Sequence, residues 1–455
     1  MPDSPFDTPA MARGQAIDVG HIVDDQPVFG LYLKVFAILF LTLLADGFDL
    51  QAMGYAAPAI VRDLGIARGA LASALSAGLV GVLIGAPAIG WFGDRFGRRN
   101  AIILGSVLYG SFCIATGWAD TATELAILRF LTGIGLGGVL PNVIALAAEF
   151  SPGRVRPMMT ALVTVGISFG GAIAGVAAAT LVPAQGWPIL FQIGGAAPLL
   201  LAILIWFVLP ESPSFLALHP NRRAEMVALL RRIKPGLAVS DTSLIVVGPN
   251  DHATTSGQPA ASLFEGPYRL ITPLVWMLFV GVLMSIYLLS SWLPLALESS
   301  GMSPKGAAVM NSMLQFGGAA GGIVVAVILG RWRWRLVVAL LGGAWAILGL
   351  LSAVALPDVW LAVGLGFCGV SLIGSQTAIN TSAGLIYPAA MRAKGVGFAL
   401  GVGRLGSISG PLIGALVLGG ASAGAQDLFL VPLLPLGIAF VAALAIVRLV
   451  RQRGL

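Results

Sequence analysis

Long apolar runs separated by short polar turns occupy most of this 455-residue chain. A helix that crosses a bilayer needs about 20 predominantly apolar residues, with a range of roughly 17 to 25. The runs that satisfy this length lie at 31–60, 69–92, 101–118, 122–149, 157–182, 188–209, 270–295, 304–329, 335–356, 358–386, 395–420 and 427–450. The pattern therefore predicts an all-α integral membrane protein with twelve transmembrane helices.

One long polar stretch interrupts this series after the sixth run. It contains a basic segment at 221–234, which predicts a short surface helix. We expect an N-terminal arm, a six-helix bundle, a cytoplasmic linker, a second six-helix bundle and a cytoplasmic tail, at 1–30, 31–209, 210–269, 270–450 and 451–455.

The two halves also resemble each other when they are aligned at a constant offset of 236 residues. Pro152 and Arg156, after the fourth run, then fall on Pro388 and Arg392, after the tenth run, and several glycines coincide as well. Two related six-helix halves are the architecture of transporters that rock about a binding site between the halves. The repeat therefore predicts two pseudo-repeat bundles with a site at their interface.

Composition and charge narrow the class of protein. Hydrophobic residues make up 57% of the chain and charged residues 10%, which is too little charge to solvate a soluble protein of this length. The net charge of +6 alone would permit a nucleic-acid partner. With the N-terminus in the cytoplasm, however, all basic residues fall on the cytoplasmic side except Arg62, Arg68 and Lys305 outside and Arg129 and Arg404 within runs. The positive-inside rule therefore predicts that both termini lie in the cytoplasm. Because the basic residues serve topology, no nucleic-acid partner is expected. We expect the protein to lie in the inner (plasma) membrane of the cell.

A glycine-rich charged motif lies between the second and third runs, with the sequence Gly90-Trp-Phe-Gly93-Asp94-Arg95-Phe-Gly97-Arg98-Arg99. Its glycines allow a tight turn and close helix approach, and its carboxylate can accept hydrogen bonds from a helix N-terminus or an arginine. We expect a cytoplasmic gate that uses this motif and two partners elsewhere: Gly90, Asp94, Arg95, Gly97, Arg98, Glu149 and Arg392. Glu149 has a local alternative, which is an interaction with Arg154 or Arg156.

This motif resembles the signature loop of the major facilitator superfamily. The resemblance extends over nearly the whole chain, because it includes the twelve runs, the central linker and Pro210-Glu-Ser-Pro213 after the sixth run. It implies the major facilitator fold and alternating access to one central site. The corresponding loop of the second half, Gly330-Arg-Trp-Arg-Trp-Arg335, departs from the pattern because it has no acidic residue.

A narrower resemblance is carried by the first run, where Leu44-Ala-Asp46-Gly-Phe-Asp49 is similar to the aromatic acid:proton symporter family. The fourth run, from Arg129 to Pro141-Asn142, and Gly403-Arg404-Leu-Gly in the eleventh run are similar to the same family. The resemblance implies proton-coupled import of benzoate-type or related carboxylic acids.

Four ionisable residues lie deep within apolar runs: Asp46, Asp49, Arg129 and Arg404. Each would cost about 2.5–3.5 kcal/mol at the centre of a lipid-facing helix, so we expect all four to face a cavity. We expect Asp46 and Asp49, which share a helix face, to couple proton uptake to binding. Arg129 or Arg404 would hold the substrate carboxylate by a bidentate contact. Alternatively, all four form a structural ion-pair network.

Uncharged polar residues within the runs are further candidates for the substrate site. They are Gln51, Asn142, Tyr287, Asn311, Gln315, Gln376 and Asn380, of which Asn142, Tyr287, Gln376 and Asn380 are assigned to substrate binding. All of them could instead form hydrogen bonds between helices. The two cysteines, Cys113 and Cys368, lie within apolar runs and are expected to be small packing residues.

The predicted function is secondary active transport: import of an aromatic or related small organic carboxylate, coupled to protons, by alternating access. The predicted partners are the organic anion, protons and the lipid bilayer, with no cofactor and no metal, and we expect a monomer. A transporter of the same fold for a sugar or dicarboxylate, or a drug/proton antiporter, is the alternative. An enzyme is not expected, because the sequence has no metal-ligand spacing, no nucleophile motif and no histidine within the runs.

Overall fold

The computed structural model describes residues 17–25, 30–234, 245–246, 260–266, 268–418 and 424–453. Much of the predicted N-terminal arm and part of the linker lie outside these ranges. Within them, twelve helical segments are long and apolar enough to cross a membrane. The predicted all-α architecture with twelve transmembrane helices is therefore confirmed.

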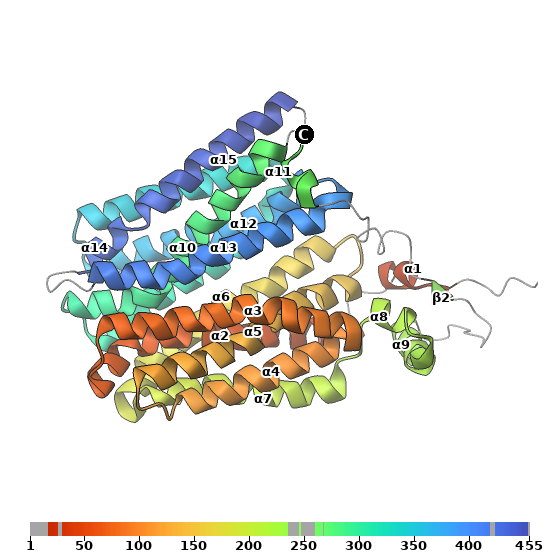
Figure 1. The fold of residues 1–455 in the computed structure, drawn as a ribbon, viewed down its shortest axis with the longest axis horizontal. Coiled ribbons are helices and arrows are strands. Elements are labelled where there is room, and N and C mark those ends of the chain that lie inside the picture. The colour runs from red at the N-terminus through yellow and green to blue at the C-terminus, as the bar shows by residue number, and fades with distance from the viewer. Residues whose placement is uncertain are drawn as a thin grey trace, which may run out of the picture.

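The long helices form two groups (Figure 1). The first bundle consists of α2 (Leu31–Leu64), α3 (Arg68–Phe96), α4 (Arg98–Thr116), α5 (Ala122–Phe150), α6 (Arg156–Gln185) and α7 (Pro188–Val208). The second bundle consists of α10 (Tyr268–Ser299), α11 (Pro304–Ala353), α12 (Asp358–Ile386), α13 (Ala389–Leu418), α14 (Ala425–Leu430) and α15 (Leu433–Arg453).

The observed helices differ from the predicted spans at two places along the chain. The sequence predicts a break between the eighth and ninth runs, yet α11 is continuous over 50 residues and contains two span-length segments, Pro304–Ile328 and Trp334–Ala353. The charged segment between them has no proline, and arginine and tryptophan are compatible with helix. Conversely, the last predicted run is divided into α14 and α15, where Pro432 lacks the N–H that a continuous helix requires.

The described part of the linker begins against the first bundle and ends against the second. It contains α8 (Pro213–Ala217), the 3₁₀ helix η1 (Pro220–Arg222), α9 (Arg223–Ile233), the strand β2 (Ile245–Val246) and the 3₁₀ helix η3 (Ala260–Phe264). Helix α9 confirms the short basic helix expected at 221–234. Its buried face packs in one apolar cluster with α8 and with α1 (Val19–Asp24). A short parallel pairing of β1 (Ile17–Asp18) with β2, which the sequence did not predict, joins the arm to the linker.

The two bundles meet along three pairs of helices, α6 with α11, α3 with α13 and α2 with α10. In Figure 1 the bundles converge at the end that lies away from α8 and α9, and they separate toward those linker helices. Polar contacts close the convergent end. Arg62 Nη1 lies 2.5 Å from Glu298 Oε2, and Arg68 donates to Ser299 Oγ (3.2 Å) and to the Leu418 carbonyl (2.5 Å).

At the opposite end, Gly97 connects α3 to α4 with a φ of +104°, a conformation that favours glycine. A Cβ atom at this position would also collide with the Glu211 carboxylate. We expect Gly97→Ala to lower the free energy of unfolding by roughly 1–3 kcal/mol, which is the usual cost of a strained backbone conformation. The thermal midpoint of the purified protein in detergent would measure this loss.

Gly90→Ala is the matched control for this variant. Gly90 lies in α3 with a helical backbone, and a Cβ atom there would have no neighbour within 4 Å. Alanine in a helix interior should leave stability unchanged or raise it slightly. Equal midpoints for the two alanine variants would contradict the assigned role of Gly97.

Candidate functional site

The centre of the first bundle contains a buried ion pair between α2 and α5. Arg129 donates from Nη1 to Asp49 Oδ1 and from Nη2 to Asp49 Oδ2, both at 2.8 Å. Cys113 of α4 donates to the same carboxylate at 2.9 Å and lies 3.2 Å from the Phe191 carbonyl oxygen. The Arg129 guanidinium also lies 5.6 Å from the centroid of the Phe191 ring. The fork of Arg129 is thus occupied by Asp49 in this conformation.

Asp46 has a different environment, although it lies on the same helix three residues earlier. Its side chain is buried, and its Oδ1 atom has no hydrogen-bond partner among the described residues. It lies within electrostatic reach of Asp49 and of Arg404, which belongs to the other bundle. A buried carboxylate without a full set of partners costs free energy that a proton or a cation would recover.

Arg404 of α13 is the second basic residue at this depth, and it is only partly buried. Its Nη1 atom lies 3.5 Å from the hydroxyl of Tyr287 on α10, a long and weak hydrogen bond. No carboxylate lies within 4.0 Å of it in the described part of the chain. Of the two arginines, Arg404 therefore has the guanidinium that is open to a carboxylate ligand.

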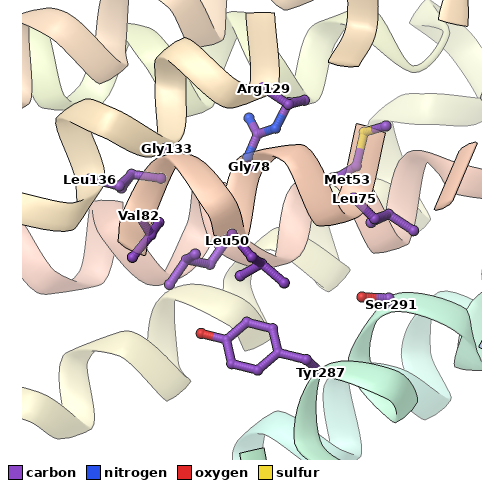
Figure 2. A pocket seen from close by; sticks show the side chains of 11 residues that line it. Leu50, Met53, Leu75, Gly78, Val82, Arg129, Gly133, Leu136, Tyr287 and Ser291 are labelled. Atoms are coloured by element: carbon purple, nitrogen blue, oxygen red, sulfur yellow. The ribbon is translucent and has the colours of Figure 1, made fainter. Parts of the chain in front are cut away.

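A pocket between the bundles lies beside these groups (Figure 2). Arg129 and Tyr287 line it, whereas Asp46, Asp49 and Arg404 are not among its lining residues. Arg129 contributes from α5 on one side, and Tyr287 and Ser291 contribute from α10 on the other. Leu50 and Met53 of α2 form part of its apolar wall. A pocket with a few polar groups on apolar walls is the usual form of a small-molecule site.

The other predicted substrate residues are not all gathered at this pocket. Asn142 is buried, donates to the Gly138 carbonyl of its own helix at 2.7 Å and fills the space beside Gly93. On α12, Gln376 donates to Asn380 Oδ1 at 2.9 Å, and the Asn380 side chain is exposed. Asn142, Gln376 and Asn380 do not line the pocket shown in Figure 2.

The predicted gate residues lie at the divergent end. Arg98 forms an ion pair with Glu149, which also accepts a hydrogen bond from the Ser212 hydroxyl. The predicted local alternative is not observed for Arg156, whose nearest carboxylate is Asp24 at 3.9 Å. Within this conformation the gate contacts therefore stay inside the first bundle and its linker.

The remaining gate residues form no ion pair across the two bundles in the described part of the chain. Asp94 and Arg392 are exposed, and neither forms an ion pair within the described ranges. Arg95 lies 5.6 Å from the centroid of the Trp91 ring, a cation–π contact on its own helix. Gly90 leaves open space beside α3, and Gly97 makes the turn described above.

Two functional contacts were missed by the sequence prediction. Cys113 was expected to be a packing residue, and nothing in its apolar run indicated that its thiol would bond Asp49. Glu211, noted only as part of the Pro210–Pro213 motif, accepts hydrogen bonds from the backbone N–H groups of Arg99 (3.0 Å) and Ser212 (2.8 Å). Its position after the sixth run and its prolines marked the motif, but its partner at the start of α4 is 112 residues away.

Comparison with known proteins gives consistent matches over almost the entire chain. A family model described as Major Facilitator Superfamily matches residues 39–411. The gallate transporter of Pseudomonas putida is 38% identical over 94% of both chains. The 4-hydroxybenzoate transporter PcaK of Pseudomonas aeruginosa is 34% identical over 91% of this chain and 92% of its own. The 3-(3-hydroxy-phenyl)propionate transporter of Escherichia coli is 32% identical over 84% and 86%, respectively.

Solved structures share the fold at much lower identity. The inward open conformation of the xylose transporter XylE from E. coli matches with a TM-score of 0.69 and 16% identity, over 92% of this chain and 96% of that one. Its partially occluded inward open conformation matches with a TM-score of 0.68 and 16% identity, over 90% and 96%. At this identity the match shows the arrangement of helices and nothing about cargo.

Proposed function

Because this chain belongs to the major facilitator superfamily and is a multi-pass membrane transporter of that fold, we propose that it imports an aromatic or related small organic carboxylate together with protons. The names of its relatives support this substrate class, since they are transporters of gallate, 4-hydroxybenzoate and a hydroxyphenylpropionate. A single chain supplies both bundles of the pocket, so we propose that a monomer is the working unit. The proton gradient supplies the energy, and no cofactor takes part.

The observation that carries the proposal is the division of the four intramembrane charges. Asp49 and Arg129 neutralise each other directly, whereas Asp46 and Arg404 interact only at longer range. A proton on Asp46 removes a negative charge within electrostatic reach of Arg404 and leaves that guanidinium free to bind a carboxylate. Proton uptake and anion binding therefore favour each other.

The same charges suggest the stoichiometry of protons and substrate in transport. The empty site, with both aspartates ionised, has a formal charge of zero, as does the site that holds one proton and one monocarboxylate. Moving the loaded and the empty site across the membrane then transfers no net charge. Symport of one proton with one monocarboxylate would be electroneutral.

We place both termini in the cytoplasm, as the distribution of Lys and Arg predicts. The convergent end, with Arg62, Arg68 and Glu298, then faces outward and the structure corresponds to an inward-facing state. Asp94 of the first bundle and Arg392 of the second are exposed in this state and have opposite charges. We propose that they approach each other when the cytoplasmic side closes, while Arg98 and Glu149 hold the ends of α4 and α5 together.

Uptake into proteoliposomes tests this function. An outside-acid gradient is expected to drive accumulation of 4-hydroxybenzoate or benzoate above equilibrium, and collapse of the gradient by a protonophore should return it to equilibrium. A potential set with potassium and valinomycin at equal pH should drive no accumulation, because the proposed cycle moves no net charge. Uptake that does not depend on the pH gradient would contradict the proposed proton coupling. Uptake of sugars and not of aromatic carboxylates would contradict the proposed substrate class.

A further inference from the structure

An uncharged polar seam lies next to the charged pocket, where α2 and α6 of the first bundle meet α11 of the second. At Gly175 of α6, an added Cβ atom would collide with both the Tyr55 hydroxyl of α2 and the Ser312 hydroxyl of α11. Because Gly175 has no side chain, the hydroxyl groups of Tyr55 and Ser312, which belong to different bundles, can both lie against α6 at this point.

The same arrangement recurs one turn away at Gly171. A Cβ atom there would contact the side chains of Gln51 from α2 and Gln315 from α11. Gln315 also donates to the Ser290 hydroxyl of α10 at 3.2 Å. Both glutamines are buried. Asn311 lies one helical turn before Gln315 on α11. We call the residues Gln51, Tyr55, Ser290, Asn311, Ser312 and Gln315 the polar seam.

Asn311, like the hydroxyl of Tyr55, has unused hydrogen-bonding capacity within the described part of the chain. Its side chain is fully buried at 0% exposure, and neither Nδ2 nor Oδ1 has a partner among the described residues. An apolar residue would fill this position without such a cost, whereas a buried amide that bonds nothing is destabilising. The vacant donor and acceptor together indicate a ligand group that can both accept and donate a hydrogen bond.

The polar seam adjoins two pockets. Ala308, which is on the same face of α11 as Asn311, lines an outer pocket together with Tyr55. On the inner side, Ser291 lines the central pocket and directly follows Ser290. A molecule that moves from the outer pocket to the central one would therefore pass these residues.

The chemistry of the seam differs from that of the central pocket. Its members are amides and hydroxyls, which carry no charge and offer both donors and acceptors. A carboxylate is better served by Arg404, whereas a phenolic hydroxyl, which donates and accepts, matches the amide of Asn311. On α10, Tyr287 beside Arg404 and Ser291 beside the seam are one helical turn apart, at about 6 Å along the axis. This separation suits an aromatic ring with a carboxylate at one edge and hydroxyls at the other.

We propose that the polar seam binds the ring hydroxyl groups of an aromatic carboxylate, and that Asn311 is the residue that selects hydroxylated over unsubstituted rings. This inference rests on the proposed function and deepens it. Because Asn311 is closed off by the packed outer end here, it would meet the ring when the bundles separate on that side.

The test is the ratio of kcat/KM for 3,4,5-trihydroxybenzoate to that for benzoate in proteoliposomes. Asn311→Leu is expected to lower this ratio about tenfold, which corresponds to the loss of one or two hydrogen bonds. Benzoate transport should stay within about threefold of the unmodified protein. The thermal midpoint should be equal or higher, because an unsatisfied amide is replaced by an apolar side chain of similar size.

Asn311→Ala, which cannot introduce a clash, should lower the ratio in the same direction. Asn100→Leu is the matched control, because Asn100 donates to the Phe96 carbonyl at the cytoplasmic end of the first bundle, away from the polar seam, and its ratio should not change. An unchanged ratio in both Asn311 variants overturns the proposal. So does a parallel loss of both substrates with a lower midpoint, since Asn311 would then serve packing. If the unmodified protein transports no aromatic carboxylate, the proposed function itself fails.

Discussion

Replacement of Asp46 by asparagine is expected to abolish accumulation of the substrate while exchange across the membrane continues. The asparagine side chain would be permanently neutral, as Asp46 is when it holds a proton, so Arg404 would remain free to bind the carboxylate in every state. Binding and movement then no longer require a proton, and the pH gradient loses its effect on transport. Gradient-driven uptake and substrate counterflow, measured on the same proteoliposomes, separate the two activities.

The structure makes Asp46 a better test of coupling than Asp49. Its Oδ1 atom lacks a partner within the described ranges, so asparagine breaks no hydrogen bond at that atom. Asp358→Asn, which removes an exposed carboxylate at the start of α12, is the control and should accumulate substrate normally. Continued accumulation by the Asp46 variant would assign the proton to another group. Loss of counterflow as well would mean that Asp46 is needed for movement and not for coupling alone.

The fold follows from the sequence to the extent that burial in lipid dictates it. The apolar runs at 122–149 and 358–386 agree with α5 and α12 to within one residue, because polar turns bound them on both sides. Hydropathy is less informative where the end of an apolar segment is not also the end of a helix. At α11 the backbone stays helical through a charged segment, and at Pro432 it breaks within an apolar one.

The sequence predicts which charged residues belong to the site, but it does not predict which of them form pairs. The cost of charge in lipid identified all four ionisable residues. Spacing placed Asp46 and Asp49 on one helix face, but three residues also separate them by about 60° around the helix axis. Accordingly, Asp49 contacts α4 and α5, whereas Asp46 lies within electrostatic reach of Arg404 in the other bundle. Contacts over 80 residues, such as that of Arg129 with Asp49, carry no local signal.

Neutralisation of the two intramembrane arginines is expected to have different effects, on transport at Arg404 and on folding at Arg129. Arg404→Gln should leave folding intact, because the native side chain is partly exposed and makes only a 3.5 Å contact. Its kcat/KM for aromatic carboxylates should fall about 10- to 100-fold, the value of a hydrogen bond to a charged group. Arg404→Lys should recover part of this loss, because lysine restores the charge without the bidentate geometry. Uptake rates and the thermal midpoint, measured together, test both statements.

Arg129→Gln should instead lower the yield of folded protein, because it leaves the Asp49 carboxylate buried without its cation. Breaking one partner of a buried pair costs about 3–5 kcal/mol, whereas removing both charges can be nearly neutral. The double variant Asp49→Asn with Arg129→Gln is therefore expected to regain most of the thermal midpoint that each single variant loses, a clear departure from additivity. Transport should return with the fold if the pair is structural. A double variant that is stable but cannot bind the carboxylate would show that Arg129, and not Arg404 alone, holds the substrate.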